Sequence, residues 1–105
     1  MKPIIGVVEW PYTDSDNDKI YEVPSDIVNK ISAAGGITVG IFPTQICDFQ
    51  GTRLSDIPEL SVNDKDDLIH ALNMCDAIIK PGTTKVYEFD KFIQSYTENK
   101  DMPYL

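Results

Sequence analysis

The chain has 105 residues, of which 42% are hydrophobic and 25% charged, a composition typical of one soluble globular domain with a modest core. Nine lysines and arginines against 17 aspartates and glutamates give a formal charge of −8, which argues against nucleic acid and anionic membrane surfaces as partners. Without a membrane-length apolar run or a signal-peptide core, we expect a cytoplasmic protein whose two cysteines, Cys47 and Cys75, are free thiols.

The N-terminal third predicts a buried strand, a loop and a helix. The strand covers residues 4–8, a short apolar run between Pro3 and Trp10. Residues 11–26, PYTDSDNDKIYEVPSD, are polar and flanked by prolines, which indicates a loop. Within it, Ser25 is the expected N-cap of a helix that ends at the Gly-Gly pair of residues 35–36.

The middle of the chain predicts a second strand, a long irregular stretch and a second helix. Residues 37–42, ITVGIF, are rich in β-branched and aromatic residues and stop at Pro43. The irregular stretch that follows is of a length that is usually functional or flexible. Ser61 and Asp64 form a variant of the capping box at the start of the helix. The predicted apolar face of that helix consists of Leu68, Ile69, Leu72 and Cys75.

The last third predicts a third strand, a third helix and the start of another strand. The strand covers residues 76–82, DAIIKPG, the helix runs from Val86 to about Glu98, and MPYL begins the next strand. Strands that alternate with helices imply a parallel sheet with right-handed crossovers and helices on both faces. The sequence therefore predicts the α/β class.

The acidic loop does not match a calcium or phosphate site. Asp14, Asp16 and Asp18 alternate as in a calcium-binding loop, but Lys19 and Ser25 stand where that loop needs glycine and glutamate. The segment also lacks the glycines that cradle phosphates. We expect a solvated loop, with no metal and no nucleotide cofactor.

A cysteine–histidine catalytic pair is not indicated by the sequence. His70, the only histidine, falls on a charged helix and is expected to be exposed or half-exposed. Cys75 lies on the apolar side of the same helix, where a buried structural role is the default. Cys47 lies in the long irregular stretch, but no residue near it in sequence is identified as its base.

The turn KPGTT, residues 80–84, is the strongest candidate for chemistry. In an open parallel sheet, ligands collect at the carboxyl ends of the strands, and a Pro-Gly turn there can direct backbone N–H groups outward as oxyanion donors. An ordinary strand-to-helix connection explains the same residues, and the turn alone favours that simpler interpretation.

Four segments together resemble a known family. KPIIGVV, KISAAGGITVGIFP, DKDDLIHALNMCDAIIKPG and the terminal DMPYL are similar to the N-terminal half of the class I glutamine amidotransferase-like superfamily, in its gamma-glutamyl hydrolase branch. This branch includes the gamma-glutamyl-gamma-aminobutyrate hydrolases. The resemblance implies that residues 1–105 form a single, truncated half-domain. The implied fold is an incomplete flavodoxin-like three-layer sandwich with a parallel sheet of three to four strands.

The resemblance also implies where chemistry would occur. Family members carry a nucleophilic cysteine shortly after the position of MPYL, together with a later histidine and glutamate, so no catalytic residue is expected in this chain. Gly82 matches the oxyanion glycine region. Thr83 stands where a second glycine is common in the family. The loop around Trp10 to Asp18 would overlook the same cleft, and Trp10 and Tyr12 are its candidate substrate contacts.

Two hypotheses for function follow. In the first, the chain is the N-terminal portion of a cysteine-dependent hydrolase of gamma-glutamyl amides, inactive alone, completed by a C-terminal half, and without a cofactor. In the second, it is a non-catalytic α/β interaction module that pairs its open sheet edge with another copy of itself.

Overall fold

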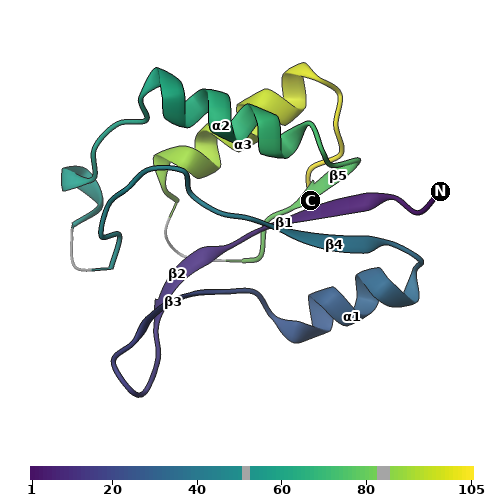
Figure 1. The fold of residues 1–105 in the computed structure, drawn as a ribbon, viewed down its shortest axis with the longest axis horizontal. Helices are drawn as coiled ribbons and strands as arrows, with labels where there is room; N and C mark the ends of the chain where they lie inside the picture. Colours follow the sequence, from purple (N-terminus) through teal and green to yellow (C-terminus); the bar gives the residue numbers. More distant parts are fainter. Residues whose placement is uncertain (51–52, 83–85) are drawn as a thin grey trace.

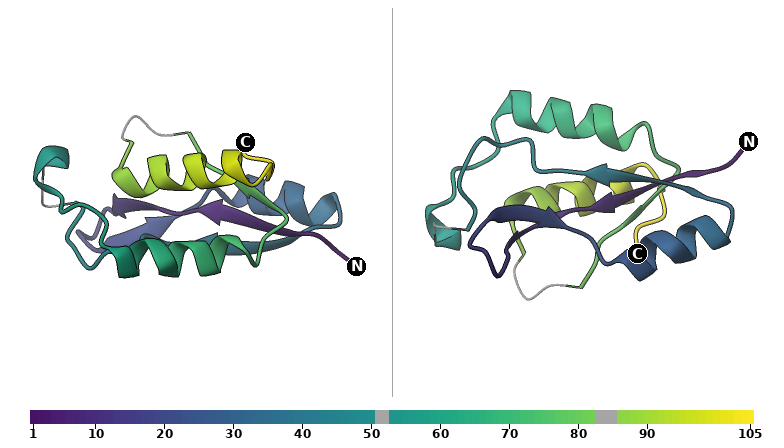
Figure 2. Two further views of the ribbon diagram at one scale, coloured as in Figure 1. Left: turned by 90° about the horizontal axis from the view of Figure 1, so that it is seen from above. Right: turned by 60° about the horizontal axis from the view of Figure 1, so that its bottom comes forward.

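A parallel sheet between two layers of helices forms the centre of the molecule (Figure 1). The computed structural model describes residues 1–50, 53–82 and 86–105. The sheet consists of β1 (Ile4–Val8), β4 (Ile37–Ile41) and β5 (Ala77–Ile79). Helix α1 (Ser25–Ala33) covers one face, and α2 (Val62–Leu72) and α3 (Glu88–Asn99) cover the other (Figure 2). The predicted α/β sandwich with a parallel sheet is confirmed.

The strand order places the first strand at the centre. Strand β1 pairs in parallel with β4 on one side, with Ile4 opposite Ile37, and with β5 on the other, with Ile5 opposite Ala77. Both partners approach closely because Gly6 has no side chain. An added Cβ there would lie 2.8 Å from Cys75 Sγ and 2.8 Å from Ile78 Cδ1.

The C-terminal segment joins the sheet beside β5. The Ile78 N–H donates to the Pro103 carbonyl oxygen at 2.9 Å, and the Leu105 N–H donates to the Ile78 carbonyl oxygen at 2.9 Å. Tyr104 thus forms a single parallel bridge with Ile78, so MPYL lies beside β5 where a strand is predicted, although only this isolated bridge is formed. The order β4-β1-β5-Tyr104 matches the first four positions of a flavodoxin-like sheet.

The main core lies on the face covered by α2 and α3. Leu68 and Leu72 of α2 pack with Phe89 and Ile93 of α3, and all four are fully buried. The predicted apolar face of α2 is therefore confirmed at Leu68 and Leu72, with Ile69 partly buried at its margin. The predicted place of Cys75 on this helix is wrong, because α2 ends at Leu72 and Cys75 lies in the connection to β5. None of the helices within the described ranges is long and apolar enough to cross a membrane.

The predicted loop at residues 11–26 is wrong, because most of it forms an antiparallel hairpin. Strand β2 (Trp10–Thr13) pairs with β3 (Lys19–Glu22). The turn between them is built by Asp14, whose carboxylate accepts the backbone N–H groups of Asp16 and Asp18 at 3.0 and 2.9 Å. Asn17 adopts the left-handed conformation, with φ of 67°, that asparagine tolerates. The Asp14 side chain thus helps to close a hairpin, while Asp16 and Asp18 contribute backbone N–H groups and are exposed.

The ends of α1 show one correct and one wrong prediction. Pro24 is the N-cap, without a side-chain hydrogen bond, and Ser25 is the first helical residue rather than the cap. At the other end, Gly35 has a φ of 90°, and the N–H groups of Gly35 and Gly36 donate to the carbonyls of Ser32 and Ile31. This is a Schellman motif, and it confirms the predicted glycine stop.

Candidate functional site

The carboxyl edge of the sheet collects the polar groups from which a site can be built. Strand β1 ends beside Glu9, β4 leads into residues 42–50, and β5 leads into Lys80 and Gly82. The β2–β3 hairpin projects from the same edge (Figure 1). In open parallel sheets this edge is where ligands bind.

The turn after β5 places Gly82 at this edge. Pro81 is buried and Gly82 is exposed, and an added Cβ on Gly82 would meet no atom of the described residues within 4 Å. As far as the described residues go, the space around Gly82 is open. Thr83, the other residue expected to contribute to an oxyanion site, lies outside the described residues.

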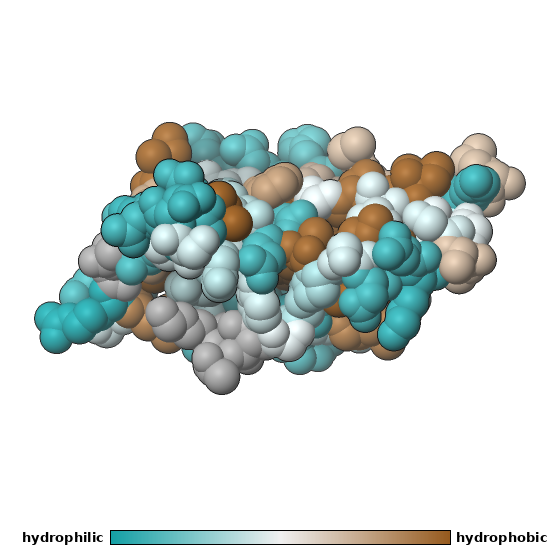
Figure 3. Space-filling view, turned by 90° about the horizontal axis from the view of Figure 1, so that it is seen from below, coloured by the Kyte–Doolittle hydropathy of each residue, from teal (hydrophilic) through white to brown (hydrophobic). Residues whose placement is uncertain are grey.

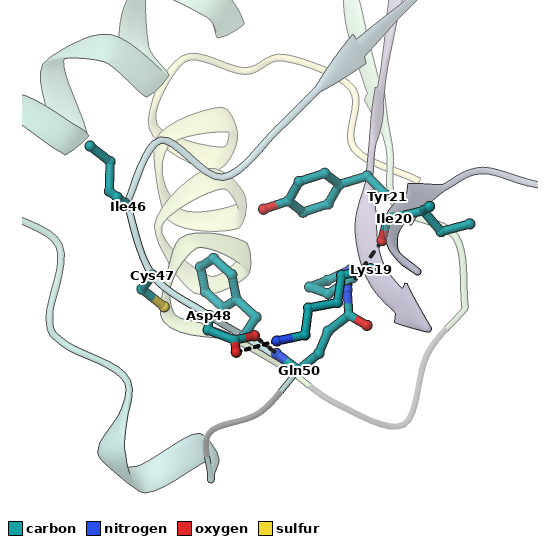
Figure 4. A pocket seen from close by; sticks show the side chains of 9 residues that line it. Lys19, Ile20, Tyr21, Ile46, Cys47, Asp48 and Gln50 are labelled. Carbon is teal, nitrogen blue, oxygen red and sulfur yellow. Dashed lines mark hydrogen bonds and ion pairs between the residues drawn. The ribbon is translucent and has the colours of Figure 1, made fainter. Parts of the chain in front are cut away.

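A pocket of about 490 Å³ opens between the hairpin and the segment after β4 (Figure 4). Here it is called the hairpin pocket. Its lining residues are Pro11, Lys19, Ile20, Tyr21, Ile46, Cys47, Asp48, Phe49 and Gln50. Trp10 and Tyr12, the predicted substrate contacts, lie in β2 on either side of Pro11 and are not among the lining residues.

Hydrogen bonds and an ion pair hold the two walls of the hairpin pocket together. Lys19 pairs with Asp48, and the Thr13 hydroxyl donates to the Gln50 side-chain oxygen. The Gln50 amide group donates to the Ile20 carbonyl oxygen at 3.3 Å. Contacts from Gln50 to both strands therefore fix the distance between the walls.

The floor of the hairpin pocket rests on the N-terminal end of α3. Phe49 is buried, and its ring meets the rings of Tyr87 and Phe89 edge to face at 5.2 and 5.6 Å. Above it, the Tyr21 ring reaches from β3 toward the segment that carries Cys47 (Figure 4). The segment after β4 is thus anchored by its aromatic residue in the core, while its polar residues face the hairpin.

Both thiols have pKa values raised above the ordinary value of a cysteine. Burial, and then the Asp48 carboxylate, raise the pKa of Cys47, so its reactive thiolate is scarce at neutral pH. Burial and Asp76 likewise raise the pKa of Cys75, which is buried as predicted. His70 is exposed, also as predicted, and its Nδ1 lies 2.8 Å from the Asp66 carbonyl oxygen of its own helix.

A buried ion pair lies beside the Gly82 turn. Lys80 Nζ lies 3.5 Å from Asp90 Oδ2, with only 18% and 5% of the two side chains exposed. The same Asp90 oxygen accepts the Tyr87 N–H at 2.8 Å, which caps the start of α3. Burial raises the pKa of Asp90, and this effect outweighs the lowering by the Tyr87 N–H and Lys80.

Glu9 is a buried carboxylate at the end of β1. Its Oε2 atom has no hydrogen-bond partner among the described residues, and Oε1 would lie 2.9 Å from a Cβ added at Gly40. Burial raises the pKa of Glu9. A carboxylate that is buried without a partner favours its protonated form.

The hairpin pocket, the Lys80–Asp90 pair and the burial of Glu9 are not predicted from the sequence. The pocket had no periodic signal, because the consecutive residues Lys19, Ile20 and Tyr21 all line it. The pair had none, because its residues are ten positions apart and on different elements. Among the described residues, no group of three or more histidine, cysteine, aspartate or glutamate side chains could hold a metal ion.

Comparison with known proteins does not identify a family for this chain. The chain matches no protein-family model and no curated protein.

Proposed function

We propose that the chain forms the N-terminal part of a cysteine-dependent hydrolase of gamma-glutamyl amide bonds, similar to the class I glutamine amidotransferases. The strand order is the observation that supports the proposal. Pro103–Leu105 lies parallel to β5, and the resemblance implies that the strand leading to the nucleophile lies at this position. Gly82 follows the neighbouring strand at the carboxyl edge and is open to a substrate. Its role is to donate its backbone N–H to the developing oxyanion.

The chain's own side chains do not supply the nucleophile or its base. The raised pKa values of Cys47 and Cys75, and the place of His70 on the outer side of α2, support this part of the proposal. The cysteine, histidine and glutamate of the reaction would belong to a C-terminal half outside this sequence. We place the reaction in the cytoplasm, in keeping with two free thiols.

Nuclear magnetic resonance with ¹⁵N-labelled protein tests this proposal. Glutamine at millimolar concentration is expected to shift the backbone amide signal of Gly82, and asparagine, one methylene shorter, is expected to shift it less. The chain alone is expected to release neither ammonia from glutamine nor amine from a gamma-glutamyl amide. Release that Cys47→Ser abolishes would overturn the proposal, and so would a Gly82 amide signal that stays unchanged at millimolar glutamine, wherever else glutamine binds.

A second candidate function is self-association through the open sheet edge. Beside that edge, on the α1 face, lies an apolar groove of about 370 Å³. Its lining residues are Pro3, Ile5, Ile27, Lys30, Ile31, Ala34, Ala77, Ile79 and Leu105. Seen from this side, apolar side chains lie between hydrophilic ones (Figure 3).

The continuity of groove and edge favours a second copy of the chain as the occupant. Leu105 both lines the groove and pairs with β5, so a strand added from another copy would cover the groove with its own apolar side chains. Light scattering at rising protein concentration is expected to show a dimer if this function holds. A monomer at every concentration would rule it out and leave the hydrolase proposal standing.

A further inference from the structure

The hairpin pocket presents two opposite charges at its rim and an apolar wall below them. Lys19 and Asp48 form the rim, with 56% and 46% of their side chains exposed. The wall contains the buried ring of Phe49, together with Pro11 and Tyr21. Gly82 does not line the pocket, so this site is separate from the turn to which the proposed function assigns chemistry.

The rim ion pair is of a kind that a ligand can replace. An ion pair in contact with water contributes little to stability, because water and salt screen both charges. A ligand that carries one positive and one negative group gives each side chain a new partner and leaves neither charge unpaired. In Figure 4, Lys19 and Asp48 meet at one side of the pocket, so both groups of such a ligand would bind there.

The charge of the whole chain argues against a purely anionic ligand. The formal charge of −8 repels anions, whereas a zwitterion has no net charge and meets no such barrier. A purely cationic ligand would take Asp48 and leave the Lys19 ammonium without its partner. The rim therefore favours a ligand with both charges close together.

The volume and the apolar wall of the pocket determine which side chain fits beside the two charged groups of the ligand. A volume of about 490 Å³ accommodates a small molecule, and an apolar wall stabilises an apolar group by removing it from water. We propose that the hairpin pocket binds a free α-amino acid with an apolar side chain, with the carboxylate at Lys19, the ammonium at Asp48 and the side chain against Phe49. This ligand site goes beyond the proposed hydrolysis of gamma-glutamyl amides.

Calorimetric titration with L-phenylalanine and its analogues tests the ligand chemistry without any mutation. Phenethylamine lacks the carboxylate, and 3-phenylpropionate lacks the ammonium. L-Phenylalanine is expected to bind with a millimolar or lower dissociation constant, and each analogue at least about tenfold more weakly. Equal binding of all three compounds, or no binding of L-phenylalanine at millimolar concentration, would overturn the proposal.

Substitutions at the rim assign the two charges. Lys19→Gln is expected to remove the preference for L-phenylalanine over phenethylamine, and Asp48→Asn the preference over 3-phenylpropionate. The matched controls are Lys30→Gln and Asp26→Asn, which remove an exposed ion pair with a 3.8 Å distance on α1. These controls are expected to keep both preferences, and their loss in the controls would overturn the assignment.

The reactivity of the Cys47 thiol gives a second measurement of binding that does not depend on calorimetry. Cys47 lines the pocket and is partly exposed, so bound L-phenylalanine is expected to slow its labelling by a thiol reagent, by up to about twofold at half-saturation if occupancy protects the thiol fully. The buried Cys75 serves as the internal reference. Labelling of Cys47 at an unchanged rate with bound ligand would overturn the location. The Gly82 amide reports the proposed hydrolase site separately, so either proposal can fail alone.

Discussion

Lys80 Nζ lies 3.5 Å from the Asp90 carboxylate, and this contact ties the end of β5 to the first turn of α3. The two elements are joined by the turn that contains Gly82. Asp90 also caps α3 through the Tyr87 N–H, so a single carboxylate fixes both the helix start and the strand end. The position of the Gly82 turn therefore depends on a contact that is itself buried.

Asp90→Ala is expected to destabilise the protein strongly. The substitution removes the cap of α3 and leaves the Lys80 ammonium buried without a partner, at a cost on the order of 3 kcal/mol. Urea denaturation measures the change in the free energy of unfolding. Asp26→Ala, which breaks the exposed pair with Lys30, is the control and is expected to cost less than about 1 kcal/mol. Equal costs would show that the Lys80–Asp90 pair is not buried in solution.

Gly6→Ala is expected to disrupt the centre of the sheet. The added methyl group would lie 2.8 Å from Cys75 Sγ and from Ile78 Cδ1, so β1 or its neighbours must shift, at a cost of about 1–3 kcal/mol. Gly82→Ala adds the same group where none of the described residues lies within 4 Å, and it is expected to leave the melting temperature nearly unchanged. A thermal melt of both variants compares them, and a larger loss for Gly82→Ala would contradict the described packing.

Ser61→Ala is expected to cost about 1 kcal/mol, because Ser61 caps α2. Its side-chain oxygen accepts the Asp64 N–H at 3.0 Å, and the Asp64 carboxylate accepts the Ser61 N–H at 2.9 Å. Ser25→Ala is the matched control, because Ser25 is the first residue of α1 and makes no cap. Chemical denaturation is expected to separate the two variants, and a larger effect at Ser25 would restore it as the cap of α1.

Ser61 and Ser25 differ in how well the sequence predicts the start of a helix. Ser61 was recognisable because Asp64 stands three residues later and completes a reciprocal pair of hydrogen bonds. Ser25 follows a proline, whose extended backbone already supplies the N-cap geometry, so the helix begins one residue earlier than the serine suggested. Local patterns thus located the strands and helices of the sandwich but not every end.

Local sequence patterns do not predict the hairpin or the pocket. The signal for β2 and β3 was hidden because the pairing depends on the left-handed Asn17 and on the Asp14 carboxylate in the turn. The pocket needs residues 46–50 to fold back on that hairpin, which the core anchor of Phe49 enforces. Tertiary contacts of this kind leave no periodic pattern in the sequence.

Glu9→Gln is expected to stabilise the protein at neutral pH. Burial raises the pKa of Glu9 above its ordinary value of 4.5, so the folded protein holds this proton at pH values where the unfolded chain has released it. The contribution of the group to stability is therefore complete below pH 4.5 and is lost as the pH rises through the folded-state pKa. Glutamine cannot ionise and escapes this loss.

Unfolding free energies measured between pH 4 and pH 8 check this expectation. Relative to the parent chain, Glu9→Gln is expected to gain about 1 kcal/mol at pH 7 and much less at pH 4, because the parent carboxyl is then protonated in both states. Glu59→Gln, at an exposed position, is the control and is expected to give the same small difference at both pH values. If Glu9→Gln instead loses stability at pH 7, the charged carboxylate has a stabilising partner in solution. Gly40 leaves room for the Glu9 side chain, so it would then border a polar site rather than a buried one.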